Sequence, residues 1–175
     1  MLTVVAVISV AAAIAVPQAA PTSAVAADAV AAEVAGALRF AQREAVRTCT
    51  YQQVSLAPAS QVLRVYQPNA SGGATSTHLV DKRPYQISFA GSAIPRATIV
   101  SSVFKYDGGP TTAYASFGPD GTPSYIDPSK VSQFLSQMFG GVDIDPLKED
   151  GEIRIRHGNV ERIVRVAPVT GRVTF

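Results

Sequence analysis

The opening of the chain is apolar and free of charge. Residues 1–16 contain only two polar side chains, Thr3 and Ser9, and no charged residue occurs before Asp28. Charged groups are the side chains that cost most in hydrocarbon, so this composition suits a lipid environment. A helix of this length extends about 24 Å, somewhat less than the roughly 30 Å hydrocarbon core of a bilayer.

Alanine-rich sequence continues the helical pattern to residue 27, and Pro17 and Pro21 would kink this helix without necessarily ending it. We therefore expect a hydrophobic helix over residues 1–27. The side chains expected to face lipid or another apolar surface are Met1, Leu2, Val4, Val5, Val7, Ile8, Val10, Ile14, Val16 and Pro17.

The same residues also allow a secretion signal that is cleaved. Ala24, Val25 and Ala26 form the small-x-small pattern that signal peptidase reads, but no Lys or Arg follows Met1. Removal of the first ~26 residues would leave a soluble exported β protein. Both interpretations stay open at this point.

Residues 28–48 have the pattern of an amphipathic helix. Apolar residues recur there at spacings of three or four, and most charged residues fall between them. We expect the apolar side of this helix to pack against a sheet through Val30, Val34, Leu38, Ala41 and Ala45.

Beyond Cys49 the sequence alternates short β-prone runs with turn residues, which predicts an antiparallel β domain over residues 49–175. The predicted strands are 51–57, 61–66, 85–89, 98–106, 113–117, 152–157, 160–166 and 172–175. A polar loop is predicted over 69–77, and a short helix over 128–139, capped by Asp127, is predicted to cover one sheet. The fold class that follows is α+β: a long N-terminal helix, with a membrane half and an amphipathic half, packed on a small antiparallel β domain.

Two of the predicted strands show which side faces the core. In 152–157, Ile153 and Ile155 face one way while Arg154 and Arg156 face the other. In 160–166, either of the adjacent apolar residues 163 and 164 could face the core. Neighbouring residues of a regular strand face opposite sides, so this pattern indicates an irregularity at that point.

Composition limits the possible functions. Charged residues are 16% of the chain and the net charge is +2, so neither a strongly basic nucleic-acid binder nor an acidic tail is indicated. The single Cys49 excludes an intramolecular disulfide and a multi-cysteine metal cluster. His78 and His157 are isolated, and the sequence has no nucleophile elbow, phosphate-binding loop or zinc-protease motif. We therefore expect no enzymatic activity and no cofactor.

One acidic cluster lies near residue 145. Oxygen ligands at Asp143, Asp145, Glu149 and Asp150 could hold Ca²⁺, but their spacing differs from the twelve-residue loop of an EF-hand. A solvated acidic loop is the simpler interpretation, so no metal site is predicted.

Four segments, taken together, resemble a known family. VVAVISVAAAIAVP is similar to the later part of a type IV pilin N-terminus, and LRFAQREAV is similar to the L-x-x-A-R-x-E-A helix signature of the pseudopilin H / FimT group of minor pilins. FGPDGTP resembles a recurring hairpin of that group, and the ending VRVAPVTGRVTF resembles its closing strand pair. Leu38, Ala41, Glu44 and Ala45 match the helix signature, whereas Gln42 stands where arginine is usual.

This resemblance implies a minor pilin or pseudopilin, which is a structural subunit of a type II secretion pseudopilus or a type IV pilus. It implies a single-pass protein of the bacterial inner membrane with residues 49–175 in the periplasm. Its partners would be other pilins, through the N-terminal helix, and membrane lipid before assembly. The family's glycine and F-T-L-I-E motif do not precede Met1, so we expect an upstream start and a basic leader removed by prepilin peptidase.

A DNA-binding minor pilin for DNA uptake is an alternative that the same resemblance suggests. The residues that could face phosphate lie on adjacent predicted strands and are Arg154, Arg156, Arg165 and Arg172. Glu152 and Glu161 partly neutralise this stripe, and alternating arginine is typical of any solvent-facing strand. Nucleic acid is therefore not the expected partner.

Overall fold

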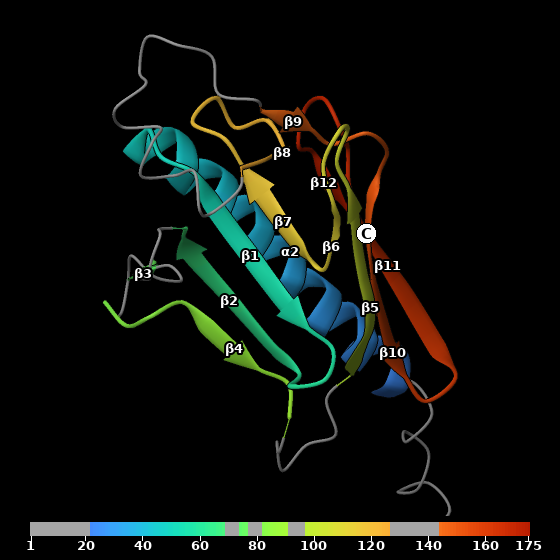
Figure 1. Cartoon of the computed structure of the whole chain (residues 1–175). Coiled ribbons are helices and arrows are strands. Elements are labelled where there is room, and N and C mark those ends of the chain that lie inside the picture. Colours follow the sequence, from blue (N-terminus) through green and yellow to red (C-terminus); the bar gives the residue numbers. More distant parts are fainter. Residues whose placement is uncertain (1–21, 69–73, 77–81, 91–96, 127–143) are drawn as a thin grey trace, which may run out of the picture.

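A computed structural model describes residues 22–68, 74–76, 82–90, 97–126 and 144–175 (Figure 1). Within these ranges the chain forms one helix, α2 (Thr22–Thr48), followed by strands that pair only in antiparallel fashion. The strands are β1 (Gln52–Ala57), β2 (Val62–Gln67), β3 (Ala74–Thr75), β4 (Gln86–Ser88), β5 (Thr98–Lys105), β6 (Thr111–Thr112), β7 (Tyr114–Phe117), β8 (Ser124–Tyr125), β9 (Asp145–Pro146), β10 (Gly151–His157), β11 (Val160–Val166) and β12 (Val173–Thr174).

The strands form two larger sheets and one small one. The first sheet has the order β3-β2-β1-β7, with β4 also paired to β2, and the second has the order β12-β11-β10-β5-β6. The third sheet is the pair β8-β9. Figure 1 shows α2 running behind β1 and β7, with the second sheet beside them, and α2 contacts strands of both larger sheets.

The buried side of α2 is broad because two sheets pack on it. Besides the predicted apolar positions, Ala31, Ala35 and Ala37 are fully buried, and their small side chains let the strands come close to the helix. Phe40 is also buried and its ring stacks on Tyr85, with 4.7 Å between the ring centroids. These residues share a single core with the inner faces of both sheets.

Side chains join the two larger sheets where their strands do not pair. At one end, the amide of Gln61 donates to the carbonyl of Ile99 at 2.9 Å and accepts from the backbone N–H of Ile99 at 2.8 Å. At the other end, the hydroxyl of Tyr106 accepts from the backbone N–H of Ser116 at 2.9 Å. Burial raises the pKa of Tyr106, so this phenol stays protonated at neutral pH.

The predicted fold class, a pilin-like α+β arrangement with a long helix on a small β domain, is wrong. The described chain is richer in sheet than that arrangement allows, with three antiparallel sheets and one helix of 27 residues. The error has a physical cause. Five of the strands are only two residues long, too short to show the period of two on which a strand prediction depends. Four of them, β3, β6, β8 and β9, extend the sheets beyond the predicted β core.

The longer predicted strands are confirmed to within one or two residues at their ends. Ile153 and Ile155 are fully buried, whereas Arg154 and Arg156 are exposed, as their alternation predicts. The predicted irregularity within 160–166 is wrong, because β11 pairs with β10 in continuous register and places Val164 inside. The register shift lies instead between β10 and β5, opposite Arg154 and Ile155.

Some predictions fall outside the described residues. They include the short helix over 128–139, nearly all of the hydrophobic helix over 1–27, His78, and Asp143 of the acidic cluster. The polar loop predicted over 69–77 contains β3, which pairs with the end of β2, so the loop prediction is wrong at Ala74 and Thr75.

Candidate assembly interface

Helix α2 presents one side to the core and the other to solvent. The five residues predicted to pack on a sheet, Val30, Val34, Leu38, Ala41 and Ala45, are at most 4% exposed and lie in the common core. Because this side is held along the length of the helix, the orientation of the exposed side is also fixed.

A line of small or apolar residues runs along the exposed side of the N-terminal half of α2, with the exposed Asp28 and Glu33 on either side of it. Val25 is 64% exposed, Ala29 and Ala32 are exposed, and Gly36 is partly exposed. Their spacing of four, three and four places them along one side of the helix. We call these four residues the α2 stripe. In the sequence, the stripe follows the uncharged apolar residues 1–16.

The described part of the domain gives no structural reason for a glycine at Gly36. Apart from its own helix, a Cβ atom built on it would meet no atom of the described residues within 4 Å, and its φ is not in the left-handed region. Glycine in the middle of a helix destabilises it by roughly 0.5–1 kcal/mol relative to alanine. The sequence signal for this position is a glycine interrupting a helical pattern, and the apolar periodicity of residues 28–48 alone did not identify it.

An ion pair holds the start of α2 to the second sheet. Arg162 Nε on β11 donates to Asp28 Oδ1, and both side chains are partly exposed. Arg162 Nη1 also donates to the carbonyl of Glu161 at 3.1 Å, on the edge of β11. The contact fixes the helix close to the point where it leaves the sheets.

Gln42 joins α2 to two turns that are far apart in the sequence. Its Nε2 donates to the carbonyl of Gly121 at 2.8 Å and to that of Thr170 at 3.0 Å. Gly121 and Gly171 have φ of +80° and +64°, and a Cβ on Gly171 would lie 2.5 Å from Gln42 Nε2. Glycine is therefore needed at Gly171 both for its conformation and for this close approach.

Glu44 lies on the same helix and is only 9% exposed. Arg47 Nε donates to Glu44 Oε2 at 2.9 Å. This hydrogen bond and the charge of Arg47 hold the pKa of Glu44 below its usual value, against the opposing effect of burial.

The lowered pKa predicts a pH-dependent contribution to stability. A carboxyl group with a depressed folded-state pKa stabilises the protein above its unfolded-state pKa, and the effect is lost as pH falls through the folded-state value. Glu44→Gln should therefore lower the free energy of unfolding by about 1 kcal/mol at pH 7, the upper end for pairs with one exposed partner. The difference should shrink below about pH 4.3, the usual glutamate pKa. Denaturant unfolding from pH 3 to 7 would check this; a pH-independent difference would contradict it.

The arginines predicted as possible DNA contacts are mostly paired with glutamate. Arg154 bonds to Glu152 at 3.1 Å and to Glu161 at 3.3 Å. Arg156 lies 3.3 Å from Glu161, and Arg165 lies 3.3 Å from Glu152. Phosphate would have to compete with two carboxylates for three guanidinium groups. Arg172 is exposed and lies in the turn leading to β12, not on the strands that carry the paired arginines.

No chemical centre stands out in the described part of the chain. No three His, Cys, Asp or Glu side chains come together there to hold a metal ion. Cys49 is exposed at the end of α2, in a left-handed conformation with φ of 51°. His157 lies at the turn between β10 and β11. Within the same ranges, no helix is both long enough and apolar enough to cross a membrane.

Comparison with known proteins adds no assignment. No family model, no curated protein and no solved structure matches this chain. Its function is therefore inferred from its own residues.

Proposed function

We propose that this chain is a minor pilin or pseudopilin, a structural subunit of a type II secretion pseudopilus or a type IV pilus. The observation that carries the proposal is that the uncharged apolar residues 1–16 are followed in the sequence by a helix whose exposed side carries the small and apolar α2 stripe. The proposal does not depend on a pilin-like fold, which the described sheets contradict.

Before assembly, residues 1–16 would lie in the inner membrane with the β domain in the periplasm. During assembly the same surface would be transferred from lipid to the helices of neighbouring subunits. Lipid tails are as apolar as the helix side chains, so the transfer from lipid to protein gains nothing from the hydrophobic effect. The association depends instead on close packing between helices. Small residues such as those of the α2 stripe let helix backbones approach one another closely.

The architecture suits such a role. The broad buried side of α2 fixes the helix in the domain, and Asp28 and Arg162 hold the end at which it emerges. Force applied to the helix during extraction would thus be transmitted to both sheets. The expected partners are other pilins, membrane lipid before assembly, and prepilin peptidase if the coding region begins upstream.

The DNA-binding alternative receives less support. Three of its four arginines are paired with Glu152 and Glu161, which reduces the positive potential available to phosphate. A soluble exported domain remains the competing function, and it differs from the proposal in the fate of the N-terminal residues.

Gly36→Leu tests the role of the α2 stripe. We expect the domain to fold as before or slightly more stably, since the new side chain meets nothing inside it and leucine favours a helix by up to about 1 kcal/mol over glycine. Filament formation should fall severalfold, because leucine would keep a neighbouring helix away. The measurement is the amount of sedimentable filament sheared from cells expressing the full chain with its sibling subunits.

Val169→Leu is the matched control, because Val169 is 77% exposed and lies in the turn after β11, outside the α2 stripe. It should leave the filament yield unchanged. Equal yields from Gly36→Leu and the unsubstituted chain would show that the stripe is not an assembly surface.

A further inference from the structure

The outer face of the second sheet is not covered by another described element. It contains a hollow of about 430 Å³ whose lining residues come from β5, from β10 and from the segment before β10. They are Ser101, Val103, Lys105, Glu149, Asp150, Glu152 and Arg154. Val103 is 39% exposed and adds apolar surface to this otherwise polar lining.

The charges in this hollow do not balance. Lys105 pairs with Glu149 at 2.7 Å, and Arg154 pairs with Glu152 at 3.1 Å. Asp150 is exposed and has no ion pair with any residue that the structure describes. The hollow therefore carries a net negative charge of one and an available carboxylate.

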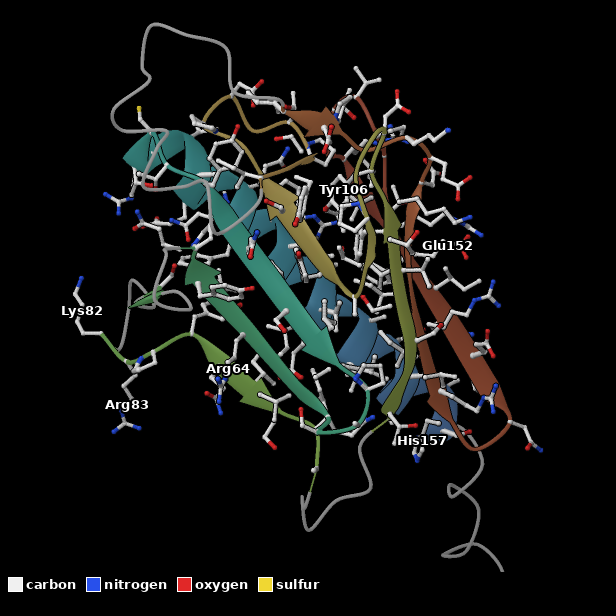
Figure 2. The ribbon with its side chains drawn as sticks, in the orientation of Figure 1. Arg64, Lys82, Arg83, Tyr106, Glu152 and His157 are labelled. Carbon is white, nitrogen blue, oxygen red and sulfur yellow. The ribbon has the colours of Figure 1, made fainter. Side chains whose placement is uncertain are left out.

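The opposite side of the molecule carries basic side chains. Figure 2 shows Arg64, Lys82 and Arg83 pointing into solvent on the far side from Glu152. Lys82 and Arg83 lie before β4, at the edge of the first sheet, and Arg64 lies on β2, the strand paired with β4. Arg64 Nε donates to the amide oxygen of Gln86 at 3.1 Å. Neither Arg64 nor Lys82 forms a salt bridge with a carboxylate of the described ranges. We call these three residues the basic edge.

We propose that the hollow on the second sheet of one copy receives the basic edge of a second copy. The two surfaces are complementary in charge and lie on opposite sides of the domain, so the contact is heterologous. A heterologous contact does not pair two copies and stop; it repeats along a ring or a filament. The inference rests on the proposed function and specifies how the β domains of neighbouring subunits meet.

Exposed ion pairs are individually weak, so this contact would not join free domains in dilute solution. Subunits already associated through their N-terminal helices are different, because the second contact is then intramolecular and benefits from a high effective concentration. Charge complementarity under these conditions mainly sets register and orientation. The contact should accordingly weaken as salt is raised.

Site-directed cross-linking tests the proposed geometry. In a Cys49→Ser background, one tagged copy of the full chain carries Lys82→Cys and a differently tagged copy carries Asp150→Cys. We expect a thiol-specific cross-linker to join the two copies in sheared filaments. Two copies that both carry Lys82→Cys should not be joined. Efficient joining of such identical copies, or no joining of the mixed pair, would overturn the inference.

Charge reversal separates this inference from the proposed function. Lys82→Glu should lower filament yield severalfold, and adding Asp150→Lys should restore it. Unfolding of the Lys82→Glu chain should match the parent, because Lys82 is exposed and has no ion pair in the described structure. Filaments that form normally with Lys82→Glu would overturn the contact but leave the subunit role intact. Failure of the parent chain to enter any filament would overturn both.

Discussion

Leu38→Ala should lower the free energy of unfolding by about 2–5 kcal/mol, the range for leucine removed from a packed core. Leu38 is fully buried near the middle of α2 and lies in the core that the helix shares with both larger sheets. Two sheets that are each fixed by their own hydrogen bonds cannot easily collapse into the space left behind. Denaturant unfolding of the detergent-solubilised full chain would measure the loss.

Val46→Ala is the matched control, on the same helix but at a side chain that is 49% exposed. This substitution should change the free energy of unfolding by no more than about 0.5 kcal/mol. A loss at Leu38 no larger than the loss at Val46 would show that α2 is not the centre of the core.

The second large effect is expected at the N-terminus. Ile8→Arg would place a charge within the apolar residues 1–16, at a cost of about 2.5–3.5 kcal/mol for a position near the centre of a bilayer. We expect this chain to be lost from carbonate-washed membranes and to be absent from filaments.

Ile8→Leu keeps the apolar character of this position and should behave like the parent chain in both measurements. Retention of Ile8→Arg in membranes and filaments at the parent's level would contradict the proposed role of the segment. The outcome tests the leading segment separately from the β domain, because Ile8 belongs to the apolar residues 1–16 and the β domain is predicted over residues 49–175.

The sequence was sufficient to predict an element where its alternation of apolar and polar residues extends over many positions. The apolar positions from Val30 to Ala45 identified the amphipathic part of α2, and the alternation in 152–157 identified the two sides of β10. The breadth of the buried side of α2 was not predictable in this way. Alanine is compatible with both buried and exposed helix positions, so Ala31, Ala35 and Ala37 gave no indication in the sequence that they are fully buried.

The architecture was mispredicted for a related reason. The two larger sheets are joined by single side chains, Gln61 and Tyr106, that bond to the backbone of the other sheet. Such contacts have no sequence period, and neither do strands of two residues such as β3 and β6. Periodicity therefore recovered the longer strands but not the way in which they assemble around the helix.

The segments on which the family resemblance rests have a physical connection in the structure. The helix signature, the FGPDGTP hairpin and the closing turn meet where Gln42 donates to Gly121 and to Thr170. The position at which the sequence departs from the signature is thus a structural contact between the helix and two turns. Spacing along the chain could not predict this contact, since Gly121 lies 79 residues and Thr170 lies 128 residues from Gln42 in the sequence.

The surface charges also illustrate what one sequence leaves undetermined. Arg154, Arg156 and Arg165 were correctly expected on neighbouring strands, but their pairing depends on the register that places Glu152 and Glu161 beside them. The basic edge was not anticipated, because its residues come from β2 and from the segment that precedes β4, which are far apart in the sequence.

The fate of the apolar leading segment decides between an assembling subunit and a freely exported domain. The intact mass of the chain recovered from washed membranes of cells that express it would measure this directly. A mature protein that retains residues 1–16 is the predicted result. A mature protein beginning near Ala27, recovered instead in the soluble periplasmic fraction, would contradict the account.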